Sequence, residues 1–133
     1  MAREALIPIK ADTDIVAARQ HGRELATKLG FVLTDATLLA TVISELARNI
    51  VRYAVRGEIC FAPVQAGERV GITVVARHKG PGTTSAALPM QNGHYTSGDL
   101  GLGLLGVKRL MDEFRLVSDT HTGTTITIKM WKR

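Results

Sequence analysis

The chain has 133 residues, of which 45% are hydrophobic and 22% charged, and a net charge of +5. This length fits a single domain, residues 1–133, that buries about two thirds of the surface of its unfolded chain. The sequence has no apolar run of 18 residues and does not open with a charged segment leading into an apolar one. We therefore expect a cytoplasmic protein with no membrane association.

The basic residues are spread along the chain, which argues against a nucleic-acid-binding surface. Lys and Arg total 17, but only residues 129–133 form a cluster. Aromatic residues make up just 5% and do not alternate with basic ones, as a platform for stacked bases would require. We expect no nucleic-acid partner, and an acidic protein partner stays compatible with the charge.

The first part of the chain predicts a strand, two helices and a hairpin. The apolar pattern places the strand at 5–9, the helices at 12–29 and 34–54, and the hairpin strands at 58–65 and 69–77. Pro8 lacks a backbone donor, so the first strand is expected at an edge of the sheet.

The rest of the chain predicts a long loop, a helix and a second hairpin. Residues 78–100 show neither helical nor strand periodicity, and we interpret 83–100 as a lid over a site. Residues 101–114 open with glycines and continue as a helix, for which we expect Leu105, Leu110 and Met111 to form the apolar face. The hairpin strands are predicted at 115–119 and 124–131, with the turn at 121–123.

The helix at 34–54 carries two polar residues that suit catalysis. Glu45 and Asn49 are four residues apart, so their side chains lie on the same face. A carboxylate can accept a proton, and an amide oxygen can hold a hard cation such as Mg²⁺. Such a pair alone is weak evidence, because Glu and Asn on a helix usually form a solvated face.

The glycines before the next helix indicate an anion site. Gly101, Gly103 and Gly106 let the backbone approach a ligand closely, and the first amides of a helix attract phosphate. The pattern is neither a Walker loop nor a dinucleotide fingerprint, since no Gly-Lys-Ser/Thr follows and no βαβ unit surrounds it. Together with the Glu45–Asn49 face and the Gly-Pro-Gly turn at 80–82, it predicts a nucleotide site.

These motifs resemble those of the GHKL superfamily of ATPases and kinases. Residues 45–54, ELARNIVRYA, and 101–114, GLGLLGVKRLMDEF, are similar to bacterial serine-protein kinases of the anti-sigma and stressosome group. Within that group the chain is most similar to the switch kinases of the stressosome, over nearly its whole length. The resemblance implies an α+β fold, a two-layer α/β sandwich of the Bergerat type. Its sheet would be mixed but mainly antiparallel, with helices on one face.

The resemblance also implies roles for individual residues. Glu45 matches the general base and Asn49 the Mg²⁺ ligand, with ATP as the nucleotide. The remaining matches are the second glycine box beneath the adenine (Gly80, Gly82), the third box around the phosphates (Gly101, Leu102, Gly103, Leu104, Gly106) and the strand threonine near the base (Thr124 or Thr125).

His78 departs from the family pattern. Family members carry Asp at this position, where the carboxylate accepts a hydrogen bond from the adenine amino group. A neutral imidazole can accept one bond, whereas a protonated ring is only a donor. Losing a buried hydrogen bond of this kind costs roughly 1–3 kcal/mol, so we expect weaker adenine binding.

The loop interpreted as a lid carries no positive charge. No Lys or Arg occurs between Gly80 and Val107. The charge of the γ-phosphate would therefore be balanced mainly by Mg²⁺ on Asn49 and by the amides at the start of the glycine-opened helix.

The leading interpretation is a serine/threonine protein kinase. By resemblance its substrates are stressosome scaffold and antagonist proteins, and the released kinase activates a downstream phosphatase. A partner-switching module in which catalysis is secondary, or an anti-sigma factor, remains an alternative. A histidine kinase is disfavoured, because no phosphoacceptor helix domain precedes the predicted ATP site.

Overall fold

The computed structural model describes residues 4–54, 56–78, 103–119 and 123–133. The predicted loop and lid at 79–102, with Gly80, Gly82, Gly101 and Leu102, lie outside these residues. In chain order the elements are β1 (Ala5–Ile9), α1 (Asp12–Lys28), α2 (Leu33–Tyr53), β2 (Gly57–Ala66), β3 (Arg69–His78), α3 (Gly103–Leu110), β4 (Glu113–Asp119) and β5 (Gly123–Trp131).

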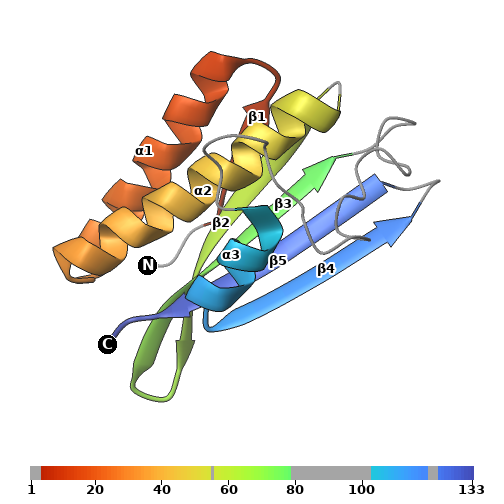
Figure 1. Cartoon of the computed structure of the whole chain (residues 1–133). Helices are drawn as coiled ribbons and strands as arrows, with labels where there is room; N and C mark the ends of the chain where they lie inside the picture. Colours follow the sequence, from red (N-terminus) through yellow and green to blue (C-terminus); the bar gives the residue numbers. More distant parts are fainter. Residues whose placement is uncertain (1–3, 55, 79–102, 120–122) are drawn as a thin grey trace.

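The strands form one sheet in the order β1-β2-β3-β5-β4. Strand β1 lies at an edge, as Pro8 predicted, and the helices cover one face (Figure 1). The expected α+β sandwich is therefore confirmed. The four strand pairs in the described part are all antiparallel. The expected mixed sheet would also contain a parallel pair, and none of these four is one.

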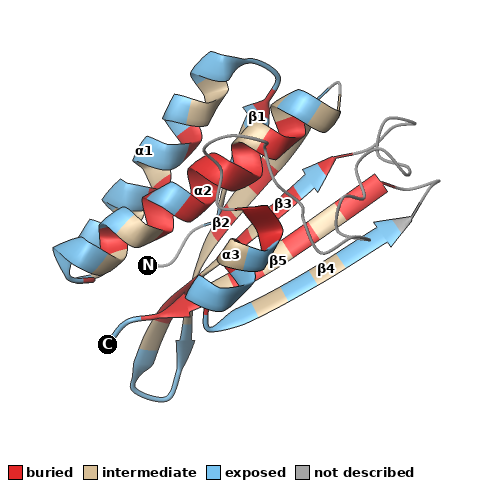
Figure 2. Ribbon diagram, in the orientation of Figure 1, coloured by how far each residue is buried: buried red, intermediate tan, exposed pale blue. Residues whose placement is uncertain are grey.

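Helix α2 is the central element of the helical layer. Every residue from Val42 to Ala47 is buried, because α1 packs along one side of the helix and the sheet lies beneath it (Figure 2). Gly22 of α1 permits this packing, since a Cβ there would meet the side chains of Ile43 and Phe61. The polar residues Ser44 and Glu45 in this stretch are therefore enclosed rather than solvated.

The helix predicted at 101–114 ends earlier than expected. Helix α3 stops at Leu110, and Glu113 and Phe114 belong to β4, where they pair with Lys129 and Ile128 of β5. The predicted apolar face is also wrong in part. Leu105 and Leu110 are exposed, whereas Leu104, Val107 and Met111 are buried. Leu104 and Val107 lie on one face of α3, and Met111, just past its end, continues that face, with its N–H donating to Val107 O at 3.2 Å.

Candidate functional site

Glu45 and Asn49 lie in the buried part of α2, with exposed fractions of 1% and 2%. Arg48 Nη1 donates to Glu45 Oε1 at 3.0 Å. Glu45 Oε2 and both polar atoms of the Asn49 amide have no hydrogen-bond partner among the described residues. Each buried polar group without a partner costs about 1–3 kcal/mol, so these groups are unfavourable for folding unless a ligand satisfies them.

His78 ends β3 and is 5% exposed. Its Nδ1 also lacks a partner in the part of the chain that the structure describes. Burial lowers the pKa of His78 below its ordinary value of 6.5, because the charged ring is desolvated. The ring is therefore neutral at pH 7, and one of its nitrogens is an acceptor.

Gly57 allows the end of β3, at His78, to lie close to α2. It opposes His78 in the β2–β3 register. A Cβ on Gly57 would lie 2.9 Å from both His78 Cβ and Ile50 Cγ2, closer than side chains tolerate. Because Ile50 follows Asn49 on α2, the absence of a side chain at Gly57 lets the Asn49 turn of the helix approach the end of β3.

Thr124 pairs with His78 across β3 and β5. It is buried, and its Oγ1 lies 3.0 Å from Ser118 Oγ. Side chains alternate along a strand, so Thr124 shares the helix-covered face with buried Ile126, whereas Thr125 points to the uncovered face. Of the two predicted threonines, Thr124 is the one that lies on the same face of the sheet as His78.

The start of α3 shows the backbone expected of a glycine-opened helix. Gly103 is buried with φ +73°, a left-handed conformation that favours glycine. Leu104 is fully buried, and Gly106 is partly buried. Helix α3 lies on the same side of the sheet as α2 (Figure 1). Gly103, Leu104 and Gly106 thus belong to the same layer as Glu45 and Asn49.

Sequence reasoning assigned no role in the site to two of its neighbours, and it left Arg48 as a nearby charge that could equally be solvated. Arg48 follows Glu45 by three residues on α2, a spacing that permits an ion pair, so its contact could have been inferred. Gly57 gave no such signal, because its role depends on a strand register and a helix position that sequence spacing does not contain.

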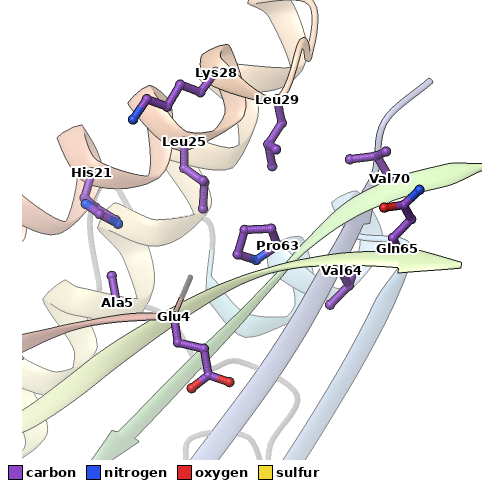
Figure 3. A pocket seen from close by; sticks show the side chains of 10 residues that line it. All are labelled: Glu4, Ala5, His21, Leu25, Lys28, Leu29, Pro63, Val64, Gln65 and Val70. Carbon is purple, nitrogen blue, oxygen red and sulfur yellow. The ribbon is translucent and has the colours of Figure 1, made fainter. Parts of the chain in front are cut away.

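A groove of the described structure lies elsewhere, between α1 and the β2–β3 hairpin (Figure 3). None of the residues predicted for the nucleotide site lines it. Within the described ranges, no group of three or more His, Cys, Asp or Glu residues is placed to hold a metal ion. Nor does any described helix combine the length and apolar character needed to cross a membrane.

Comparison with known proteins identifies the family of the chain. The family model described as histidine kinase-, DNA gyrase B- and HSP90-like ATPase matches residues 34–133, from α2 to the end of the chain. The serine/threonine-protein kinase RsbT of Bacillus subtilis (strain 168) is 45% identical over 133 residues, and the match covers 100% of both chains. The chain therefore belongs to the GHKL superfamily, the histidine kinase-, DNA gyrase B- and HSP90-like ATPases.

Proposed function

We propose that this chain is a serine/threonine protein kinase that uses ATP with Mg²⁺. The observation that carries the proposal is a set of buried polar atoms without described partners: Glu45 Oε2, the Asn49 amide and His78 Nδ1. Their chemistry matches a proton acceptor, a cation ligand and a base-recognition group. The kinase relative that matches the whole chain supports the same assignment.

The residues present fit Mg–ATP, which when bound supplies the phosphoryl group to be transferred and the cation that balances its charge. Asn49 Oδ1 is a hard oxygen ligand that has no hydrogen-bond partner among the described residues, and Mg²⁺ prefers such oxygens. Satisfying Asn49 in this way would remove the cost of burying its amide unpaired.

Glu45 would act as the general base. Arg48 holds Oε1 and thereby fixes the orientation of the carboxylate, while Oε2 is left to accept the proton of an incoming Ser or Thr hydroxyl. A base oriented by a second group is a common arrangement in catalytic sites. Arg48 is thus a positioning residue in this proposal.

The phosphates would be held by backbone rather than by basic side chains. We assign this role to the start of α3, with Gly103, Leu104 and Gly106, and to Gly101 and Leu102 before it. His78 and Thr124 would border the base, with Gly80 and Gly82 beneath it. Neutral His78 can accept a hydrogen bond from an exocyclic amine, but less strongly than a carboxylate does.

For partners we propose stressosome scaffold and antagonist proteins as substrates and a downstream phosphatase as the protein that the free kinase activates. The setting would be a cytoplasmic stress response, and one domain, residues 1–133, would carry all of these roles. The support is the resemblance of residues 45–54 and 101–114, together with the name of the kinase relative.

Mass spectrometry of candidate partner proteins after incubation with the chain, ATP and Mg²⁺ tests the proposal. We expect phosphate on a Ser or Thr of the partner, and no phosphate when Mg²⁺ is removed or when Asn49 is replaced by Ala. Phosphate transfer that is equally fast in Asn49→Ala would contradict the proposed site.

A non-catalytic partner switch or an anti-sigma module is the second candidate. His78 favours it, because this position departs from the family's adenine-binding Asp and weakens the case for tight ATP binding. The two candidates differ in whether phosphate transfer is needed for the downstream partner to be activated. Gel filtration with sigma factors separates the anti-sigma role, since only that role predicts a stable complex with one of them.

A further inference from the structure

A groove of about 940 Å³ runs between α1 and the outer half of the β2–β3 hairpin. Leu25 of α1 and Leu29, which follows the helix, face Pro63 of β2 across it, and Val70 of β3 closes one end (Figure 3). Its floor is therefore apolar. Glu4 and Ala5 also line the groove, and the described residues leave it open, so its apolar side chains are available to a partner.

The strand register explains why this space is open. Among the described residues, β1 pairs with β2 only from Gly57 to Phe61, so no described strand lies beside residues 62–66 of β2 on that side. The hairpin extends past the helices at this end of the molecule (Figure 1). A sheet face left uncovered by the helical layer is completed most simply by another helix.

Pro63 makes an added strand a poor occupant. It lacks a backbone N–H, and proline within a strand is typical of an edge that does not accept further pairing. A partner in this groove would bind through side chains rather than through a ladder of backbone hydrogen bonds. An amphipathic helix binds in that way, with its apolar face in the groove.

The charges that line the groove are unevenly distributed: Glu4 lies beside Ala5, and the basic groups lie at the end near Val70 (Figure 3). Lys28 lines the groove beside Leu29, and Lys132 lies at the same end, next to Val70. The backbone N–H of Lys132 donates to Val70 O at 2.7 Å, and its Nζ lies 2.8 Å from where a Cβ on Gly30 would be. Two ammonium groups thus flank one end of the apolar floor and would attract an acidic partner.

From the apolar floor, the free edge and the basic end, we propose that this groove binds an amphipathic α-helix of a partner protein. The helix would place its apolar face against Leu25, Leu29 and Pro63, and its acidic residues would lie next to Lys28 and Lys132. This interaction surface is separate from the nucleotide site, so binding there does not depend on ATP.

Two designed peptides test the charge requirement. Both are about 18 residues long, enough for a marginally stable helix, and carry the same Leu face, one with Glu and the other with Lys on the polar face. We expect fluorescence anisotropy to show the acidic peptide binding at least about tenfold tighter at low salt, an advantage that shrinks as salt screens the charges.

Three variants locate the peptide. Leu25→Glu should abolish binding of the acidic peptide, and Lys28→Glu should weaken it and strengthen binding of the basic one. Arg19→Glu is the matched control, because Arg19 also carries a positive charge on α1 but lies nine residues from Lys28. Nine residues are about 2.5 turns, so Arg19 points to the opposite side of the helix. Circular dichroism checks that each variant is folded.

Equal affinity for the acidic and basic peptides would overturn the proposal, as would an equal effect of Arg19→Glu and Lys28→Glu. Analytical sedimentation tests the remaining possibility, that a second copy of this chain binds in the groove. Self-association that Leu25→Glu abolishes, with no binding of either peptide, would identify the groove as an interface between copies and would also overturn the proposal.

Discussion

Buried polar groups lack described partners at one end of the sheet and are hydrogen-bonded at the other. Where β3 ends and β5 begins, His78 Nδ1 is buried without a described partner, and the same holds for the Asn49 amide of the overlying α2. Where β5 ends, Asp112 accepts the backbone N–H of Trp131 at 2.7 Å and an Arg133 guanidinium N–H at 3.0 Å, and Arg69 stacks on the Trp131 ring at 4.1 Å.

This contrast separates the end of the sheet that carries the proposed nucleotide site from the end where polar interactions stabilise the fold. Burial alone raises the pKa of Asp112, but its bonds to Trp131 and Arg133 outweigh that effect and hold the pKa below its ordinary value. The interactions of Asp112 thus favour the folded state, whereas the buried Asn49 amide opposes it until a ligand binds. Substitutions at the two ends should therefore change different measured quantities.

Glu45→Gln should give the largest effect. Gln keeps an oxygen for Arg48 but cannot accept a proton, so phosphate transfer should fall by roughly 10²–10⁴-fold while ATP affinity stays nearly unchanged. Glu45→Ala should also remove transfer and, in addition, leave Arg48 without its carboxylate. Calorimetry and a phosphotransfer assay separate the two quantities. Loss of ATP binding as complete as in Asn49→Ala would show that Glu45 is not the base.

The sequence predicts the scaffold better than the site. The boundaries of α2 agree within one residue at each end, because its apolar residues recur over 21 positions. Helix α3 spans only eight residues, and the pairing of Glu113 with Lys129 overrides the helical pattern at 113–114. Local periodicity decides the first case and tertiary pairing the second.

For the candidate site, spacing placed Glu45 and Asn49 on one face of α2. It did not reveal that both side chains are buried, nor that the Asn49 amide lacks a described partner. Those properties arise from the packing of α1, the sheet and Gly57 against α2, which the spacing of residues within α2 does not contain. The choice of Thr124 over Thr125 likewise depends on which face of β5 the helices cover.

His78→Asp should tighten ATP binding by roughly tenfold or more, which is about 1.4 kcal/mol. A carboxylate accepts a hydrogen bond from the adenine amino group but meets an acceptor oxygen on guanine, so GTP affinity should hardly improve. Because this position is buried, the introduced carboxylate would be desolvated. Both proteins are therefore compared at about pH 8, where that carboxylate would be ionised and His78 neutral.

His78→Asn is the matched control for this substitution, since it changes the shape of the side chain without adding charge. It should not reproduce the gain for ATP. If the Asp form bound ATP equally or more weakly than the natural chain, His78 would already serve the site, or the base would lie elsewhere.

Asp112→Ala tests the other end of the sheet. It removes the acceptor of the Trp131 N–H and the partner of Arg133, so the free energy of unfolding should fall by about 1 kcal/mol. Asp112→Asn retains an acceptor for Trp131 and should lose less. Urea unfolding followed by Trp131 fluorescence measures both. ATP affinity should be unchanged, and a marked loss of affinity would contradict the separation of the two ends.

The smallest expected effect is on the pH dependence of stability, and it arises from His78. Burial holds the pKa of His78 below 6.5 in the folded protein, so below pH 6.5 the unfolded chain binds more protons than the folded one. The contribution of neutral, buried His78 is therefore complete above pH 6.5 and is lost as the pH falls toward the folded pKa. His78→Asn removes this titration, so the free energy of unfolding of the variant should decline less than that of the natural chain on acidification.

Denaturant unfolding of both proteins without nucleotide, at a series of pH values on either side of 6.5, measures the difference. Parallel curves would show that His78 does not gain or lose its proton differently on folding.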